Sequence, residues 1–339
     1  MQMFTAAKKG IDLRLTAKNF FGLIAPELEL VEAEYERQVN SNIQVVNFLG
    51  EYVRASGGKR VRPALLLLAV YAAGGIGKDP SAVRMATVME MLHTATLVHD
   101  DIIDNAGLRR NRESVNARFG NQTAVLMGDW LYMNAFEASL KERSLEILDI
   151  LTRLTRQMTE GELIQLTLIG KVDLTHDEYF DIVRRKTAYL FSGCCEIGAI
   201  LGQIDQSGRA GLRNFGMNLG VAFQLADDLL DITADESSLG KSAGADLIEG
   251  KVTIPLILLI EQDDSVRAIV QKIFETGEFP AELRADILGR MRTRGIIDQV
   301  RSIAAEYAGT SRKNLEVLPE TEYSRALDAI PEFVIERQN

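Results

Sequence analysis

The sequence predicts an all-α fold, built as one large helical bundle around a helix-lined central cavity. Apolar residues recur with helical spacing in almost every long segment, and short alternating runs rich in Val, Ile and Thr are scarce. The composition is globular, with 46% apolar and 25% charged residues, so a large core can form. Since no stretch rich in Pro, Gly or Ser resembles a linker, we expect a single domain over residues 1–339.

The predicted helices follow the apolar spacing and end at turn residues. The turn from Gly74 to Pro80 ends one helix, and Ser81 is the expected N-cap of the next. Pro63 is expected to begin the helix after an earlier glycine-rich turn. A polar, glycine-rich run at 237–244 predicts a loop. The predicted ranges are 26–40, 42–56, 62–74, 81–104, 121–140, 144–169, 176–204, 209–233, 254–261, 264–276, 280–292, 295–313 and 323–337.

Charge and cysteine content exclude some classes of protein. The net charge is −10, which argues against nucleic acid as a partner because phosphate binding needs a basic face. Cys194 and Cys195 are adjacent, a spacing that rarely forms a disulfide, so a cytoplasmic location is expected. The N-terminal residues lack the charged start and long apolar run of a signal peptide. No apolar run of about 18 residues predicts a transmembrane segment.

Two aspartate clusters with identical spacing, each in an apolar context, carry the strongest functional signal. Their members are Asp100, Asp101 and Asp104 in the first cluster, and Asp227, Asp228 and Asp231 in the second. Residues four apart share a helix face, so Asp100 and Asp104 are expected to point the same way. Carboxylates on largely buried helices are costly to ionise without cations. One such cluster is about as well explained by a solvated helix end, but two favour a divalent-metal site.

The chemistry of these ligands indicates which metal they hold. Carboxylate oxygens without His or Cys favour a hard cation, and Mg²⁺ commonly bridges carboxylates to substrate phosphates. An EF-hand is excluded, because its alternating Asp/Asn ligands and central glycine are missing. No Ser-His-Asp set or P-loop is visible, so hydrolase and nucleotide-kinase functions have no support.

Basic residues beside the clusters supply counter-charges for an anionic substrate. Arg and Lys bind diphosphate through charge-assisted hydrogen bonds, and although each residue alone reads as a surface charge, their shared position favours a diphosphate site. His93 lies two helical turns before Asp100, as a core residue or as a donor to the diphosphate. His99 and His176 are assigned no role. The basic residues are Lys59, Arg60, Arg62, Arg109, Arg110, Lys186, Lys241 and Lys251.

These residues lie in stretches that match the motifs of a known family in the family's order. The stretches are GGKRVRP (57–63), HTATLVHDDIIDNAGLRR (93–110), MGDWL (127–131), KTAYLF (186–191), FQLADDLLD (223–231), GK (240–241) and DLIEGKVTIP (246–255). The chain therefore resembles the trans-isoprenyl diphosphate synthases, also called polyprenyl synthetases. The resemblance implies a Mg²⁺-dependent prenyltransferase with the all-α isoprenoid synthase fold, usually a homodimer, that condenses isopentenyl diphosphate with an allylic diphosphate.

The resemblance also implies a role for each matching position. The direct Mg²⁺ ligands, for three ions when substrate is bound, would be Asp100, Asp104 and Asp227, supported by Asp101, Asp228 and Asp231. The allylic diphosphate would be held by Arg109, Lys186, Lys241 and Lys251, with Lys186 and Lys251 counted as catalytic. Isopentenyl diphosphate would be held by Lys59, Arg62, His93 and Arg110. Thr187 and Gln224 would place oxygens near the developing carbocation.

The face of the helix that bears Asp100 is expected to set product length. Counting back by helical turns places Thr96, His93, Leu92 and Met89 near that face. Ala95 and Thr96 stand five and four residues before the cluster, and the resemblance implies that a bulky aromatic there stops growth at about three isoprene units. Both are small, so we expect a long product of about six to ten units, with octaprenyl diphosphate favoured. Phe136 is a candidate floor of the cavity. Gly216 and Gly220 leave room for the tail or allow close helix packing, with equal support.

Three alternatives remain at this point. One is a short-chain synthase that makes farnesyl or geranylgeranyl diphosphate. A second is a terpene cyclase or head-to-head synthase of the same fold, but a cyclase usually replaces the second aspartate cluster, which is present here. The third is a non-catalytic partner subunit of a hetero-oligomeric synthase, which usually loses one cluster, whereas this chain keeps both.

Overall fold

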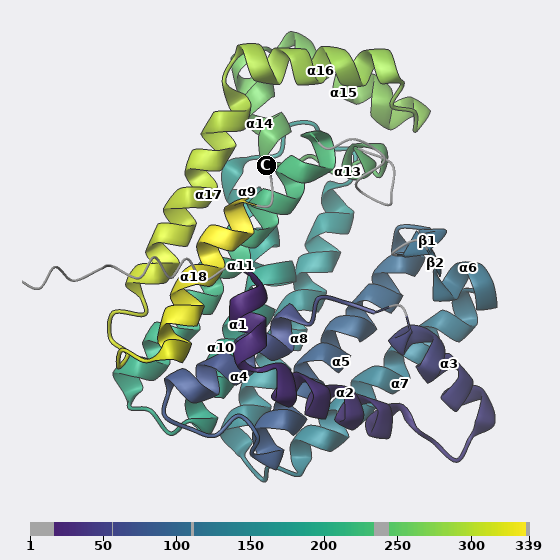
Figure 1. The fold of residues 1–339 in the computed structure, drawn as a ribbon. Helices are drawn as coiled ribbons and strands as arrows, with labels where there is room; N and C mark the ends of the chain where they lie inside the picture. Colours follow the sequence, from purple (N-terminus) through teal and green to yellow (C-terminus); the bar gives the residue numbers. More distant parts are fainter. Residues whose placement is uncertain (1–16, 56, 110–111, 234–243, 337–339) are drawn as a thin grey trace, which may run out of the picture.

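The computed structural model describes residues 17–55, 57–109, 112–233 and 244–336, and these are almost entirely helical (Figure 1). Within those ranges, the only strands are β1 (Leu108–Arg109) and β2 (Arg112–Glu113), a short antiparallel pair. The all-α prediction is therefore confirmed. The helices are α1 (Ala17–Leu23), α2 (Ala25–Val39), α3 (Gln44–Arg54), α4 (Val61–Ala72), α5 (Pro80–Ile103), α6 (Val115–Phe119), α7 (Asn121–Leu140), α8 (Leu145–Leu168), α9 (His176–Val183), η1 (Arg184–Ala188), α10 (Tyr189–Leu201), α11 (Gln206–Thr233), α13 (Ala245–Ile248), α14 (Ile254–Gln262), α15 (Ser265–Thr276), α16 (Ala281–Thr293), α17 (Ile296–Lys313) and α18 (Glu322–Glu336).

Every predicted helix is present, but the roles predicted for Ser81 and Pro63 at helix starts were wrong. The N-cap of α5 is Asp79 rather than Ser81, because the Asp79 side chain accepts a hydrogen bond from the Ser81 backbone N–H at 2.8 Å. Helix α4 begins before Pro63, with Arg60 as its N-cap. The prediction also missed the short helices α1, α6 and α13, which have too few turns to show a clear period.

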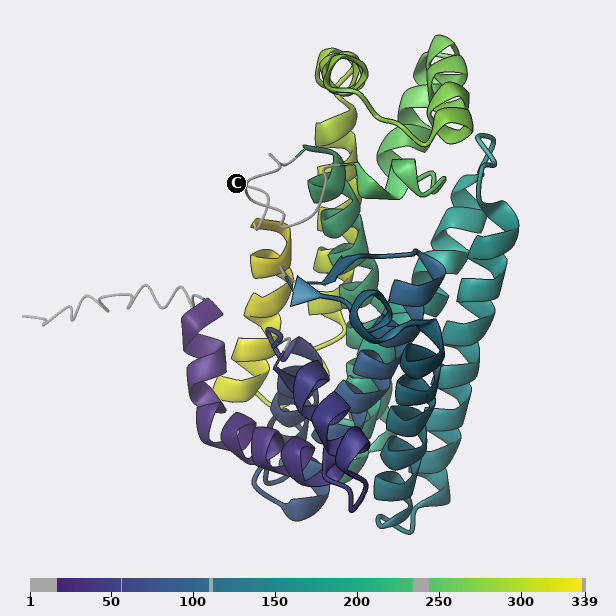
Figure 2. The same ribbon diagram turned by 90° about the vertical axis from the view of Figure 1, so that its right-hand side faces the viewer.

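The described helices bury two apolar clusters that share α11. One cluster takes residues from α4, α5, α7, α8 and α10, in the lower part of Figure 1. The other gathers α9, α14, α15, α16 and α17 toward the top of that view. Figure 2 shows the long helices running along the length of the molecule. Since α11 contributes Leu219 to the first cluster and Leu225 to the second, it connects the two. The single domain over 1–339 stays a prediction.

Two glycines of α11 allow close contact with the neighbouring helices. A Cβ at Gly216 would lie 2.5 Å from the Phe191 carbonyl oxygen, and one at Gly220 would lie 2.5 Å from the Ala188 Cα. These distances leave no space for any added atom without a backbone shift. Both glycines therefore serve helix packing, and the alternative that they make room for a substrate tail was wrong.

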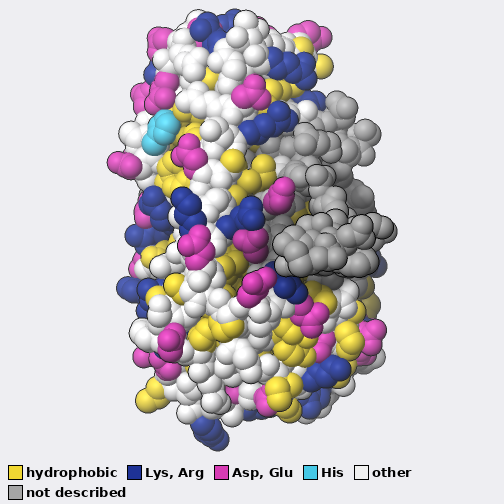
Figure 3. All heavy atoms as spheres, turned by 60° about the vertical axis from the view of Figure 1, so that its left-hand side comes forward, with side chains coloured by type: hydrophobic (Ala, Val, Ile, Leu, Met, Phe, Trp, Pro, Cys, Tyr) yellow, Lys and Arg dark blue, Asp and Glu magenta, His cyan; other side chains and the backbone are white. Residues whose placement is uncertain are grey.

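The surface carries charges of both signs. On the face shown in Figure 3, acidic and basic side chains are interspersed. The chain as a whole carries a net charge of −10. None of the helices in the described ranges has both the length and the apolar character needed to cross a lipid bilayer.

Candidate active site

The first aspartate cluster lies where α5 ends, and its three carboxylates have different surroundings. Asp100 is half-buried and lines a cavity that also takes residues from α8, α9 and α11. Asp101 is only 3% exposed and accepts a hydrogen bond from Arg109 Nε at 2.9 Å. Because α5 ends at Ile103, Asp104 is its C-cap, and its carboxylate accepts from Lys251 Nζ at 2.8 Å. Of the three, Asp100 is the residue that faces the main cavity directly.

The second cluster occupies the last turns of α11. Asp227 is exposed to the cavity, whereas Asp228 and Asp231 are buried at 3% and 6% exposure. Asp231 supports the chain that follows: its Oδ2 accepts from the Asp246 backbone N–H at 3.3 Å, and its carbonyl accepts from Gly244 at 2.8 Å. The cluster therefore combines one accessible carboxylate with two that shape the walls of the site.

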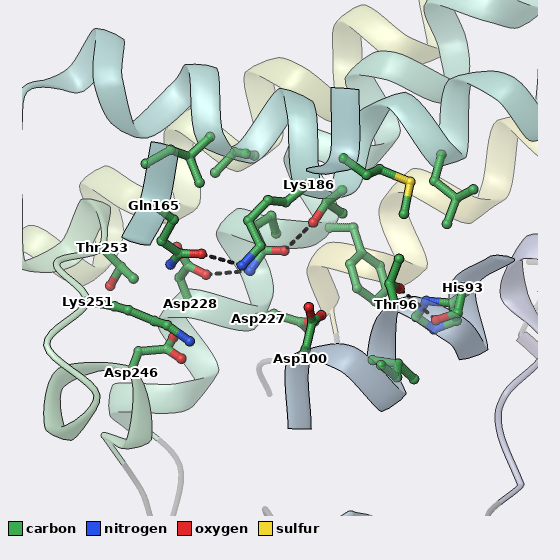
Figure 4. Close-up of a pocket in the computed structure, with 18 of the residues that line it drawn as sticks. His93, Thr96, Asp100, Gln165, Lys186, Asp227, Asp228, Asp246, Lys251 and Thr253 are labelled. Carbon is green, nitrogen blue, oxygen red and sulfur yellow. Dashed lines mark hydrogen bonds between the residues drawn. The ribbon is translucent and has the colours of Figure 1, made fainter. Parts of the chain in front are cut away.

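Both clusters meet at a single cavity of about 820 Å³. The cavity is bounded by the turn before α4, by α5, α8, α9, η1, α10 and α11, and by residues 246–253. Figure 4 shows Asp100 and Asp227 pointing into the same part of this space from α5 and α11. Asp228 also lines the cavity. The two clusters, 127 residues apart in sequence from Asp100 to Asp227, are thus brought together as the sequence predicted.

The predicted allylic-diphosphate residues lie at the same end of the cavity. Lys186 forms an ion pair with Glu162 and donates to Gln165 Oε1. Lys251 donates to Asp104 and, at 2.7 Å, to Glu249. Arg109, Lys186 and Lys251 all line the cavity. Lys241 and Arg110, which the sequence also predicted, lie outside the described residues, as does most of the glycine-rich run 237–244.

The predicted isopentenyl-diphosphate residues line another part of the wall. Lys59 comes from the turn before α4, Arg62 comes from the first turn of α4, and His93 comes from α5. Lys59 is exposed, and the Arg62 guanidinium lies 5.1 Å from the centroid of the Phe191 ring. Three cationic or polar donors therefore surround a space that is continuous with the one beside the aspartates.

A chain of hydrogen bonds links the two predicted cation-facing residues to the second cluster. Thr187 Oγ1 donates to Gln224 Oε1 at 2.8 Å, and Gln224 Nε2 donates to Asp228 Oδ1 at 2.7 Å. Asp228 Oδ2 accepts from the Tyr179 hydroxyl at 2.6 Å. Lys186 and Thr187 lie in η1, a single π-helical turn, which turns these side chains differently from a regular α-helix. Thr187 and Gln224 both line the cavity, with orientations fixed by this chain.

Four residues of the site were missed by sequence reasoning: Tyr179, Asp246, Glu162 and Gln165. Tyr179 holds Asp228, and Asp246 lines the cavity beside it. Glu162 and Gln165 both hold Lys186 from α8. Asp246 begins one of the matching stretches, so its position gave a signal that was not used. The other three have no characteristic spacing, and only the packing of α8 and α9 against η1 brings them into the site.

The predicted chain-length residues fall into two groups. Thr96 lines the cavity one turn before Asp100, as Figure 4 shows. Ala95, Leu92 and Met89 are fully buried at 0% exposure and do not line the cavity in this structure. Phe136 is half-buried against the apolar cluster that contains α5 and α7. The apolar wall of the cavity instead includes Leu97, Met158, Leu190 and Phe223.

Burial raises the proton affinity of carboxyl groups in both aspartate clusters. Burial raises the pKa of Asp100 to about 7, with Lys186 opposing the shift and Glu162 and Asp104 adding to it. Burial, followed by the charge of Asp246, raises the pKa of Asp228 to about 8. Near neutral pH both groups therefore hold a proton for a substantial fraction of the time. A divalent cation beside them would favour the ionised forms.

The donor set fits a magnesium site that is completed by substrate. In the part of the chain that the structure describes, no three Asp, Glu, His or Cys side chains converge as a ready-made metal site. Mg²⁺ usually takes only one or two carboxylates and fills its other positions with water and substrate phosphates. Asp100 and Asp227, on facing walls of a wet cavity, can each supply such a carboxylate.

The raised pKa values predict that metal binding and stability depend on pH. A carboxyl with a higher pKa in the folded chain holds its proton more tightly there, so the metal-free protein loses stability as pH rises from about 4 to about 8. Mg²⁺ must displace these protons, so its stabilising effect should grow over the upper part of that window. Thermal unfolding with and without MgCl₂, at about pH 6 and about pH 8.5, measures this. A magnesium-induced shift in Tm that is equal or smaller at the higher pH would contradict the prediction.

Comparison with known proteins gives a consistent result. The Polyprenyl synthetase family model matches residues 43–287. The octaprenyl diphosphate synthase of Escherichia coli (strain K12) is 36% identical over 317 residues, which cover 93% of this chain and 97% of that protein. The all-trans-nonaprenyl-diphosphate synthase (geranyl-diphosphate specific) of Rhodobacter capsulatus is 36% identical over 315 residues, with coverage of 93% and 96%.

A solved structure shares both the fold and the sequence pattern. The crystal structure of the polyprenyl synthase from Caulobacter crescentus CB15, complexed with calcium and isoprenyl diphosphate, superposes with a TM-score of 0.90 at 32% identity. The match covers 96% of this chain and 98% of that chain. The resemblance inferred from the motifs is thus confirmed, and the chain belongs to the polyprenyl synthetase family.

Proposed function

We propose that this protein is a Mg²⁺-dependent prenyltransferase that adds isopentenyl diphosphate repeatedly to an allylic diphosphate, giving a long all-trans polyprenyl diphosphate. The observation that carries the proposal is the meeting of the two aspartate clusters and two groups of cationic residues around one cavity of about 820 Å³. An all-α protein that merely bound a metal would have no need for two separate groups of phosphate-binding residues. The octaprenyl and nonaprenyl synthases among its relatives support a long product.

The allylic substrate is proposed to bind with its diphosphate between Asp100 and Asp227. Bound Mg²⁺, of which three ions are proposed, would neutralise the leaving diphosphate and so favour ionisation of the allylic C–O bond. Arg109, Lys186 and Lys251 add positive charge at the same end of the cavity. Since Lys251 and Lys186 are already held by carboxylates, they are oriented before substrate arrives. In this proposal Lys241 and Arg110 contribute from outside the described ranges.

The second substrate is proposed to bind with its diphosphate at Lys59, Arg62 and His93. Its double bond then attacks the allylic carbocation, and the new bond extends the chain by one unit. A proton is lost from the carbon beside the new cationic centre, and the released diphosphate is the proposed acceptor. No protein carboxylate is therefore required as the base.

The walls of the cavity are suited to a carbocation intermediate. Thr187 and Gln224 line the cavity, and their side-chain oxygens would stabilise positive charge there without forming a bond. The hydrogen-bond chain through Asp228 and Tyr179 keeps both side chains in place. The apolar residues Leu190 and Phe223 limit the water that would otherwise trap the cation.

A homodimer and a cytoplasmic location complete the proposal. On α7, Leu126, Met133 and Leu140 are 68%, 63% and 51% exposed and lie seven residues apart, so they form one apolar line. This spacing is typical of a helix that packs against another helix, and we propose that a second copy of the chain covers it. Both cysteines are unpaired and buried, which suits the reducing cytoplasm.

Incubation with isopentenyl diphosphate, an allylic primer and MgCl₂ tests the function. The expected result is Mg²⁺-dependent consumption of isopentenyl diphosphate and a product of about six to ten units, octaprenyl favoured, read by mass. Geranyl, farnesyl and geranylgeranyl diphosphates supplied in turn identify the preferred primer. A product of three or four units would show a short-chain synthase. No turnover by the purified chain would contradict the proposal and favour a non-catalytic partner subunit.

A further inference from the structure

The turn before α4 and the first turn of that helix carry three cationic residues, and the middle one is arranged differently from its neighbours. Lys59, Arg60 and Arg62 all line the cavity. The Arg60 side chain is only 15% exposed, and its guanidinium is already engaged by two carboxylates. Nη2 donates to Glu32 Oε2 at 3.0 Å, Nε donates to the other oxygen of Glu32, and Nη1 donates to Glu90 Oε1 at 2.7 Å. Arg60 is thus bonded to protein rather than directed at a ligand.

The backbone of Arg60 has an unfavourable left-handed conformation, which the ion pairs of its side chain help to hold. Its φ of +50° and ψ of +36° lie in the left-handed region, which disfavours residues other than Gly, Asn and Asp. Arg60 is also the N-cap of α4, although its side chain forms no capping hydrogen bond. The contacts of its side chain with Glu32 and Glu90 explain why an arginine occupies this position. The guanidinium ties the turn to Glu32 on α2 and to Glu90 on α5, and it lies 5.5 Å from the centroid of the Tyr35 ring.

The ion pair between Arg60 and Glu90 places a neutralised carboxylate on the wall of the site. It is 4% exposed, it lines the cavity, and it lies one helical turn before His93 on α5. Burial raises the pKa of the Cys194 thiol, while the charge of Arg62 opposes this shift and the charge of Glu90 adds to it. Arg62 and Glu90 therefore both lie near Cys194. A buried carboxylate there, without a bound cation, would repel a diphosphate and compete with it for Arg62.

We propose that Arg60 is a positioning residue for isopentenyl diphosphate. Its bonds to Glu32 and Glu90 fix the start of α4, with Lys59 just before it and Arg62 in its first turn. They also neutralise Glu90, so that this carboxylate does not compete with the diphosphate. The fork of the guanidinium bridges two carboxylates on different helices, which a lysine cannot do in the same way. The inference rests on the proposed function, since it concerns one of the two substrate subsites.

Steady-state kinetics of Arg60→Met tests the inference. The KM for isopentenyl diphosphate should rise by about tenfold or more, whereas the KM for the allylic primer should stay within about twofold, because Glu90 lies ten residues before Asp100, about 15 Å along α5. Adding Glu90→Gln to Arg60→Met should restore most of the loss, because the uncompensated charge is then removed. Arg60→Lys should give an intermediate KM and serves as the readout if the methionine variant does not fold.

Arg84→Met is a matched control from the same protein. Arg84 and Glu142 form an ion pair of similar burial, with side chains 20% and 6% exposed against 15% and 5% for Arg60 and Glu90. Neither residue lines the cavity, so Arg84→Met should lower Tm and leave both KM values unchanged. The inference is overturned if Arg60→Met behaves like Arg84→Met, or if the double variant shows no recovery. An inactive wild-type protein in this assay would instead refute the proposed function.

Discussion

Replacing Asp100 or Asp227 by alanine should lower the rate of prenyl transfer by about a thousandfold or more without unfolding the protein. The two carboxylates face the same part of the cavity from α5 and α11. Neither carboxylate can replace the other. A diphosphate held through metal from one side only is neither neutralised nor oriented as a leaving group. Turnover with isopentenyl diphosphate and an allylic primer, at saturating MgCl₂, measures the loss.

The stability of these variants separates a catalytic role from a structural one. Because burial raises the pKa of Asp100 to about 7, its ionised form costs the metal-free protein stability above that pH. Asp100→Ala should therefore keep or slightly raise Tm without metal, and it should lose much of the stabilisation by Mg²⁺. Asp149→Ala, on an exposed position of α8, is the control and should change neither property. A large drop in the metal-free Tm of Asp100→Ala would show that Asp100 supports the fold.

Helical spacing predicted much of the fold and the aspartate clusters, because both depend on local sequence. The apolar period of α5 and α11 places Asp100, Asp227 and Asp228 on the cavity wall, and that period is visible in the chain itself. It also predicted that Asp104 shares the face of Asp100, and the charge of Asp104 does add to the rise in the pKa of Asp100. It did not predict that Asp104 accepts a hydrogen bond from Lys251, 147 residues away. No local pattern identifies a partner at such a separation.

The same limit explains the residues that were missed. Tyr179 and Asp228 are 49 residues apart, and Lys186 and Gln165 are 21 residues apart on different helices. Their contacts depend on the crossing of α8, η1 and α11, which is set by close packing such as Gly220 against Ala188. The identity of a buried hydrogen-bond partner follows from tertiary packing, whereas the identity of a helix face follows from sequence.

Product length is the second property for which a large change is expected. Thr96→Phe should shorten the product by several isoprene units, because the phenyl ring would enter the cavity about 6 Å along α5 from Asp100. Ala95→Phe should act in the same direction, since Ala95 is next to Thr96. It is also fully buried, so the larger side chain would displace its neighbours and lower Tm. Product mass after complete consumption of isopentenyl diphosphate measures both.

Thr94→Phe distinguishes a blocked cavity from a disturbed helix. Thr94 lies two residues from Thr96, about 200° around α5, and does not line the main cavity. The same substitution there should leave product length unchanged, whatever it does to Tm. Unchanged products from both Thr96→Phe and Ala95→Phe would mean that the tail leaves the aspartates along another wall. The apolar side chains of Met158 and Phe223, on α8 and α11, would then be the boundary to alter next. If Thr96→Phe shortens the product and Thr94→Phe does not, the tail must pass along the Thr96 face of α5, because the two substitutions place the same ring on opposite faces of one helix.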